Sequence, residues 1–187
     1  MPNILIPLAQ GCEELEAVTL IDLLRRAQFN VVSAGLESTV TTIKASRGTL
    51  LVPDTTLDEA LKSEYDMIVL PGGLPGADHL NNDPRIIELL QKMAAAGKYT
   101  CAICAAPRAL ARAGILEGRR ATSYPGTLDK MNISGMTYTG DAVTRDGTII
   151  TSRGPGTAME FALSLIEAIG GKPLCQQVEA PLLCQQK

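Results

Sequence analysis

One stretch constrains the fold more than any other, with the sequence YTCAICAAPRALARAG from Tyr99 to Gly114. Its first part, Tyr99–Ile103, is a short apolar run of residues that suit a buried β-strand. Small residues, a proline and a helical run that ends at Gly114 follow at once. The order predicts a strand that turns sharply into a helix, with Cys104 at the bend.

A cysteine at such a bend has two interpretations. The first amides of a helix carry partial positive charge and favour a thiolate over a thiol, so Cys104 would be a reactive nucleophile. This is the arrangement of a nucleophile elbow, with sulfur in place of the serine oxygen. The alternative is a small apolar residue packed beneath the helix, the usual place of a buried cysteine. The residues alone leave both interpretations open.

The N-terminal segment predicts a strand, a helix and a second strand. The strands are expected over Asn3–Leu8 and Asn30–Ser33, and the helix over Gly11–Ala27. Three elements within so few residues are typical of a right-handed crossover unit in a parallel sheet. The apolar positions expected on the buried face of the helix recur every three residues, at Leu15, Val18, Ile21 and Leu24.

The same alternation continues along the rest of the chain. We expect further strands over Met67–Leu70, Tyr99–Ile103, Arg120–Ser123, Met136–Thr144 and Thr148–Ser152, and further helices over Leu57–Lys62, Pro84–Ala96 and Thr157–Ile169. The segment Glu37–Pro53 breaks the alternation and predicts a β-hairpin or a pair of edge strands. The pattern predicts one α/β domain over residues 1–187, with a mostly parallel central sheet and a hairpin excursion.

Composition narrows the function classes. The chain has 17 Lys and Arg against 20 Asp and Glu, a net charge of -3, which disfavours a nucleic-acid-binding surface. No apolar run is long enough to cross a membrane, and the N-terminus does not have the pattern of a signal peptide. Five cysteines without metal-binding spacing favour a reducing compartment, hence the cytoplasm. Cys101 and Cys104 are spaced as C-x-x-C, but Cys101 falls inside the strand, so a thioredoxin-type pair is disfavoured.

Two groups could assist a thiolate. The only histidine, His79, follows the strand end Gly72-Gly73, but it is placed in a helical turn that leads away. Glu16 is the least solvated of three glutamates at the start of the first helix, and partial burial would raise its pKa. A surface carboxylate that interacts with the helix dipole is the simpler interpretation of each of these glutamates.

Other residues carry weaker signals. The double glycine Gly72-Gly73, directly after a buried strand, permits a close approach of the backbone to a ligand. Arg26 and Arg47 could bind an anionic group or only face solvent. The Gly154–Gly156 turn is too short for a phosphate loop and has no lysine. The sequence contains no zinc, haem or calcium spacing, so we expect neither a metal nor a cofactor.

Several motifs together resemble the ThiJ/PfpI superfamily, most closely its parkinsonism-associated deglycase branch. The matching pieces, in chain order, are EELEAV with DLLRRA, SRG, VLPGG with PGA, AICAAP, DKM and TSRGPGTAMEFAL. The tail VEAPLL fits the same branch, so the resemblance covers essentially the whole chain. AICAAP between PGG and SRGPGT is a specific combination, whereas each piece alone would be weak.

The resemblance implies a flavodoxin-like sandwich that forms a homodimer. It implies that Cys104 is the nucleophile, that Glu16 is its protonated partner, and that the Gly73 and Ala105 amides bind the oxyanion. Arg26 and Arg47 match basic residues near the family's active site and dimer region. It also implies a cofactor-free enzyme of oxidative-stress defence that acts on methylglyoxal, glyoxal or their early adducts on amines, or a covalent chaperone.

One departure bears on mechanism. Where many members have a histidine before a proline, this chain has Tyr124, whose ordinary pKa of about 10 makes it a poor base near neutrality. A glutamate-assisted cysteine enzyme remains the leading hypothesis. The alternatives are a redox sensor or holdase chaperone with an oxidisable Cys104, and, less favoured for lack of a base, a cysteine peptidase. Cys12 might pair with an oxidised Cys104, although an inert thiol is the simpler interpretation.

Overall fold

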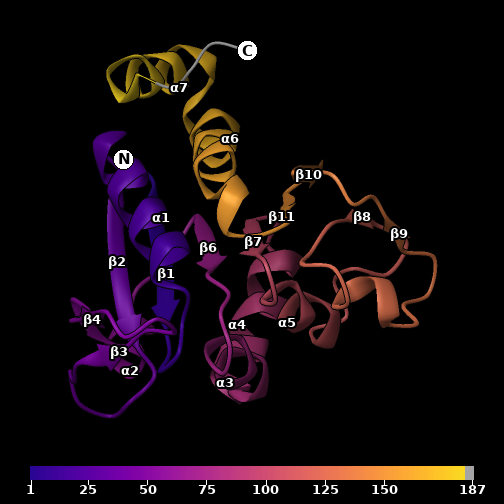
Figure 1. Ribbon diagram of the computed structural model, residues 1–187, viewed down its shortest axis with the longest axis horizontal. Helices are drawn as coiled ribbons and strands as arrows, with labels where there is room; N and C mark the ends of the chain where they lie inside the picture. Colours follow the sequence, from indigo (N-terminus) through magenta and orange to yellow (C-terminus); the bar gives the residue numbers. More distant parts are fainter. Residues whose placement is uncertain (184–187) are drawn as a thin grey trace.

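A seven-stranded sheet forms the centre of the fold (Figure 1). The computed structural model describes residues 1–183, so Cys184 lies outside the described residues. The strands lie in the order β10-β11-β7-β6-β1-β2-β5, and all neighbours are parallel except β10 and β11. Their bounds are β1 Asn3–Leu8, β2 Asn30–Gly35, β5 Thr55–Thr56, β6 Met67–Leu70, β7 Tyr99–Ile103, β10 Val143–Asp146 and β11 Ile149–Ser152.

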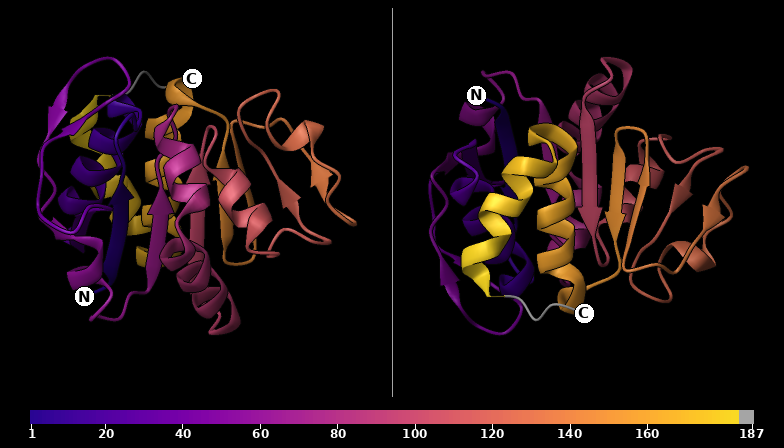
Figure 2. Two further views of the ribbon diagram at one scale, coloured as in Figure 1. Left: turned by 90° about the horizontal axis from the view of Figure 1, so that it is seen from below. Right: turned by 90° about the horizontal axis from the view of Figure 1, so that it is seen from above.

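Helices cover both faces of this sheet, as the two opposite views of Figure 2 show. On one face, α1 (Glu14–Arg26) packs against α6 (Ala158–Gly170), which in turn packs against α7 (Lys172–Glu179). On the other, α3 (Gly76–Asn82), α4 (Pro84–Ala95) and α5 (Pro107–Arg112) pack against one another. A short α2 (Leu57–Ala60) contacts β2. The architecture is a flavodoxin-like α/β sandwich, as the sequence predicted.

Most expected elements are confirmed. β1, β6 and β7 have the expected bounds, and Asp83 caps α4 by accepting a 2.9 Å hydrogen bond from the Arg85 amide. The hairpin expected within Glu37–Pro53 is the antiparallel pair β3 (Ile43–Lys44) and β4 (Leu50–Leu51).

Two expectations were wrong. Leu15 and Val18 lie on the exposed side of α1, at 50% and 46% exposure. A step of three residues advances only about 300° around a helix, so positions three apart drift away from one face. The buried face is made instead by Glu16, Ala17, Leu20, Leu23 and Leu24.

The strand expected over Met136–Thr144 is broken. Gly140 has a left-handed φ of +71°, and only Val143–Asp146 continues as β10. The earlier part forms β9 (Thr137–Tyr138), which pairs in parallel with β8 (Arg120–Ala121) in a separate small sheet. β10 and β11 form an antiparallel hairpin whose turn contains Gly147.

The sheet topology places the functional loops. Adjacent β1 and β6 send their chains to opposite faces, to α1 and α3 respectively. In open α/β sheets, ligands bind at the carboxyl edge beside such a reversal. Within residues 1–183, no helix is long and apolar enough to cross a membrane.

Candidate active site

Cys104 lies at the bend between β7 and α5, as the sequence predicted. Its φ of +63° is a left-handed conformation that a non-glycine residue seldom adopts. The backbone is held on both sides, because its N–H donates to the Ser152 carbonyl at 3.0 Å and its carbonyl accepts from the Tyr124 amide at 2.8 Å. Cys104 retains 9% exposure, so its sulfur lies at the border of the core. A left-handed backbone at a non-glycine residue is strained. Such strain is typical of functional sites, where the surrounding structure enforces the conformation.

Glu16 comes from the first turn of α1 and is fully buried. Its Oε2 accepts a 2.8 Å hydrogen bond from the Gly72 amide, whereas its Oε1 is buried without a hydrogen-bond partner among the described residues. Burial is the largest influence on this carboxyl and raises its pKa to about 7, against the lowering effects of Gly72 and Cys104. The expected rise in the Glu16 pKa is therefore confirmed, and the burial is more complete than the sequence indicated.

The double glycine after β6 brings these two residues together. A Cβ added at Gly72 would lie 2.6 Å from Cys104 Cβ and 2.8 Å from Glu16 Oε2. A Cβ added at Gly73, whose φ is +87°, would lie 2.3 Å from the Glu13 amide nitrogen. Both positions require glycine because the backbone passes directly between α1 and the bend.

The backbone amides of Gly73 and Ala105 donate to the Cys104 sulfur and lower the pKa of its thiol. Burial and the negative charge of Glu16 act in the opposite direction, and they raise the thiol pKa to about 12. The thiolate that the sequence predicted at this bend is therefore not favoured near neutral pH. Two amides do not offset a nearly complete loss of water together with an adjacent carboxylate.

Cys104 and Glu16 form one titrating pair. The lower of its two pKa values, about 7, belongs mainly to the buried carboxyl, and the higher, about 12, belongs mainly to the thiol. Between these pH values the pair holds a single proton. Transfer of that proton from sulfur to Glu16 would produce a thiolate that the Gly73 and Ala105 amides already face.

The remaining candidate residues lie at different distances from this pair. Arg47 is exposed, and its amide donates to both Glu14 carboxylate oxygens at 3.0 and 3.1 Å, so its loop adjoins the first turn of α1. Tyr124 is 52% exposed and is bonded through its amide to Cys104. Arg26 pairs with Asp22 at 2.8 Å near the C-terminal end of α1, about 15 Å along the helix axis from Glu16. Within one chain, the structure does not bring Arg26 to the bend.

A hollow of about 370 Å³ lies beside the bend. Tyr124, Arg153 and Gly154 line it, and the Tyr124 ring covers Gly154. Arg153 belongs to the sequence TSRGPGT, and nothing in the spacing of the residues connects it to Cys104, so its place beside the bend becomes apparent only in three dimensions.

Other thiols and the histidine do not share this environment. Cys12, Cys101 and Cys175 are buried and free, and burial is the first cause that raises the pKa of each thiol. His79 lies on α3 and lines a different hollow, and it is not among the groups that act on the Cys104 thiol. Among residues 1–183, no three His, Cys, Asp or Glu side chains are grouped to hold a metal ion.

Comparisons with known proteins identify the family to which this chain is similar. A model of the DJ-1/PfpI family matches residues 2–168. "Glutathione-independent glyoxalase DJR-1.2" of Caenorhabditis elegans is 38% identical over 180 residues, 92% of this chain and 94% of the relative. "Protein DJ-1 homolog B" of Arabidopsis thaliana is 44% identical over 172 residues, 91% of this chain, and the chain spans only 39% of that relative's length.

The fold is also that of solved structures. The crystal structure of Drosophila melanogaster DJ-1beta superimposes with a TM-score of 0.92 at 39% sequence identity and covers 99% of both chains. The chain as a whole therefore has a known architecture.

Proposed function

Because this chain belongs to the DJ-1/PfpI family, we propose that it is a cofactor-free cysteine enzyme of the deglycase or glyoxalase type. Its substrates would be reactive dicarbonyls such as methylglyoxal and glyoxal, or their early adducts on amines, and its role would be protection against carbonyl and oxidative stress. One observation carries the proposal: a buried carboxyl with a pKa of about 7 lies against a thiol that two backbone amides face. A proton acceptor with a pKa near the working pH is the most effective kind of general base.

In the proposed reaction, Glu16 accepts the Cys104 proton as sulfur attacks the aldehyde carbon of methylglyoxal. The product is a hemithioacetal, whose oxyanion accepts hydrogen bonds from the Gly73 and Ala105 amides before it is protonated. Glu16 gives the thiol proton to this oxyanion and is again a free base. It then moves the proton of the former aldehyde carbon to the neighbouring carbonyl carbon, while the hydroxyl proton passes to the neighbouring carbonyl oxygen, which leaves a lactoyl thioester on Cys104. Water hydrolyses the thioester to lactate and restores the thiol, so one methylglyoxal and one water give one lactic acid.

Substrate binding is assigned to the groups around the bend. Gly72 contributes the close backbone approach, Tyr124 covers one side of the adjoining hollow, and Arg47 lies on the loop beside the first turn of α1. Arg26 could reach this site only from a second copy of the chain. Its proposed role in substrate binding therefore requires a homodimer.

The homodimer has its own support in the exposed side of α1. Leu15 and Val18 are apolar and exposed there, and Asp22 and Arg26 continue the same strip. If the two copies pack this strip antiparallel across a two-fold axis, Arg26 of the partner subunit approaches the first turn of α1. The four free cysteines of the described residues fit a reducing compartment, and we propose the cytoplasm.

The test is lactate release from methylglyoxal, free and after reaction with an amino acid, by the unaltered chain and by Cys104→Ala. We expect the variant to lose release by at least about a hundredfold. Cys175→Ala serves as the control, because Cys175 is a buried thiol on α7 away from the bend. Equal rates for the unaltered chain and Cys104→Ala would remove the proposal.

A second function, redox sensing, is favoured by the unpartnered Glu16 Oε1. Two equivalents of peroxide would convert the Cys104 thiol to a sulfinic acid and release two waters. A protonated Oε1 would then donate to a sulfinate oxygen. Intact mass after mild peroxide should show a gain of two oxygens, absent from Cys104→Ala. Oxidation spread over several thiols would count against sensing.

A further inference from the structure

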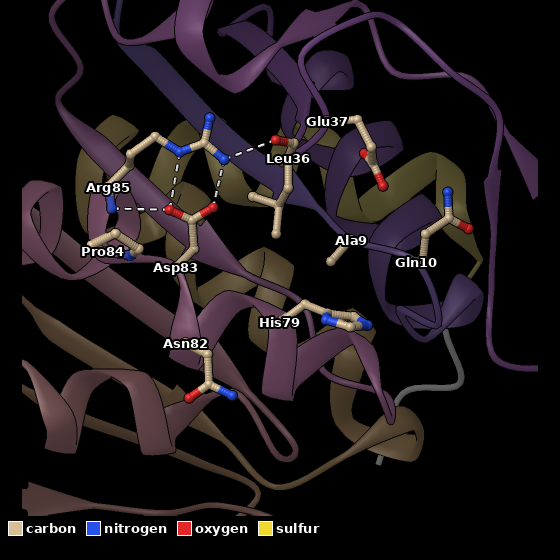
Figure 3. A pocket seen from close by; sticks show the side chains of 9 residues that line it. All are labelled: Ala9, Gln10, Leu36, Glu37, His79, Asn82, Asp83, Pro84 and Arg85. Atoms are coloured by element: carbon tan, nitrogen blue, oxygen red, sulfur yellow. Dashed lines mark hydrogen bonds and ion pairs between the residues drawn. The ribbon is translucent and has the colours of Figure 1, made fainter.

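A second hollow lies at the carboxyl edge of the sheet, where β1 and β2 end (Figure 3). It encloses about 440 Å³, and its polar lining consists of Gln10, Glu37, His79, Asn82, Asp83 and Arg85. Cys104 and Glu16 do not line it. Its chemistry is therefore separate from that of the candidate active site.

Most of these polar side chains are already satisfied within the protein. Gln10 accepts from the Lys44 amide at 2.9 Å and donates to the Thr42 carbonyl at 3.1 Å. Arg85 donates to Asp83 and Asp58, each at 2.6 Å, and to the Leu36 carbonyl at 2.8 Å. These bonds shape the wall, and they leave the Arg85 guanidinium engaged by carboxylates of its own chain.

Glu37 and His79 are the exceptions. Glu37 Oε2 is buried without a hydrogen-bond partner among the described residues, close to Gly35. No hydrogen bond of the His79 imidazole is present within residues 1–183, and Figure 3 shows it across the hollow from the Glu37 carboxyl. The Glu37 side chain lines the hollow and makes no hydrogen bond or ion pair within residues 1–183, so a ligand that supplies a charged donor gains a hydrogen bond at this carboxyl.

The charge of the lining selects the kind of ligand. Glu37 and Asp83 contribute two negative charges and Arg85 one positive charge, a formal net of -1. An anion would meet the unpaired Glu37 and no free cation in the wall. A metal ion would find only Glu37 and His79 uncommitted, and no metal-binding cluster exists among the described residues.

We propose that this hollow binds a small organic cation through a primary ammonium group. The ammonium donates one N–H to the Glu37 carboxylate and a second to an imidazole nitrogen of His79. The apolar side chain of Leu36 and the Ala9 methyl, which also line the hollow, contact the carbon chain of the ligand. The binding step is reversible and involves neither Cys104 nor its substrate.

The probe is 1,4-diaminobutane, added to the ¹⁵N-labelled full-length chain while amide chemical shifts are followed by NMR. We expect saturable shifts at the amides of Gln10, Glu37 and His79. Sodium phosphate and 1-butanol, which test anion binding and apolar contact alone, should leave these signals unchanged. Saturable shifts with phosphate, or no shifts with the diamine, would overturn the proposal, as would tight zinc binding at the same residues.

Variants make the test specific. Glu37→Gln keeps the shape and removes the charge, and should weaken diamine binding by about tenfold or more. Glu88→Gln removes an exposed carboxylate of α4 that does not line the hollow, and should bind as the unaltered chain does. Cys104→Ala should also bind normally, so a failure of the proposed thiol chemistry would not affect this result. Undiminished binding to Glu37→Gln would contradict the assignment.

Discussion

Glu16 is a buried carboxyl whose pKa rises from an ordinary value of 4.5 to about 7 on folding. A raised pKa means that the folded chain holds this proton more tightly than the unfolded chain. The associated stability is complete below about pH 4.5 and is lost as pH rises through about 7. Glu14, Asp54 and Asp83 have lowered pKa values, so they complete their titration below this window.

We therefore predict that the free energy of unfolding falls by roughly 3 kcal/mol between pH 5 and pH 8, and that Glu16→Gln removes most of this slope. Urea unfolding at several pH values in this range measures the free energy of unfolding and its dependence on pH. Glu88→Gln, an exposed glutamate on α4, should keep the slope of the unaltered chain. A slope that persists in Glu16→Gln would show that another group causes it.

The position of Cys104 at a bend was predictable from sequence, because an apolar run, two alanines and Pro107 follow one another there. The raised pKa of its thiol was not. It depends on how deeply the sulfur is buried and on a carboxylate 88 positions earlier in the chain, and neither is visible in local sequence.

At the scale of elements, the loop between β6 and α3 positions the site. Gly73 has a φ of +87°, and a Cβ there would collide with the Glu13 amide nitrogen at 2.3 Å. Gly97 has a similar φ of +67°, but an added Cβ would meet nothing within 4 Å. Alanine substitutions at these two glycines therefore separate two costs in folding free energy. Gly97→Ala shows the cost of a left-handed backbone alone, and Gly73→Ala adds the cost of a steric clash.

We predict that Gly97→Ala costs about 1 kcal/mol of stability, and Gly73→Ala about 3 kcal/mol or more together with most of the activity. Thermal or urea unfolding, with lactate release on the same samples, measures both. Equal losses for the two variants would mean that the close approach of the β6 loop to α1 is not required.

Elements with strong local signals were predicted well. The helix α4 begins at Pro84 as expected, and the uninterrupted apolar runs form the strands β6 and β7. The prediction of which face of α1 is buried was wrong, because Glu16, a charged residue, belongs to the core and Leu15 does not. A buried carboxyl takes a position there that an apolar residue would normally fill, and such departures from the usual pattern are typical of functional sites.

At the scale of the whole molecule, the apolar strip of α1 predicts the proposed dimer. We expect Leu15→Lys combined with Val18→Lys to convert a dimer into a monomer, because like charges would face each other across the two-fold axis. Analytical ultracentrifugation measures the mass. Met131→Lys, at another exposed apolar residue, should leave the mass unchanged. A mass that does not change in the double variant would place the interface elsewhere.

The overall architecture followed from the alternation of short strands and helices, which permits few arrangements other than a layered α/β sheet. The positions of the hollows could not be predicted from this alternation. The one that contains Glu37 and His79 is assembled from residues more than 40 positions apart, and their free hydrogen-bonding groups become apparent only in three dimensions.

We propose that Glu16 takes the proton of Cys104 during catalysis. The most direct test of this proposal is the pH dependence of kcat/KM for lactate release from methylglyoxal, for the unaltered chain and Glu16→Gln. We expect kcat/KM of the unaltered chain to rise through a midpoint near pH 7, and Glu16→Gln to lose this midpoint and at least about a hundredfold in kcat/KM. An unchanged profile in Glu16→Gln would contradict it.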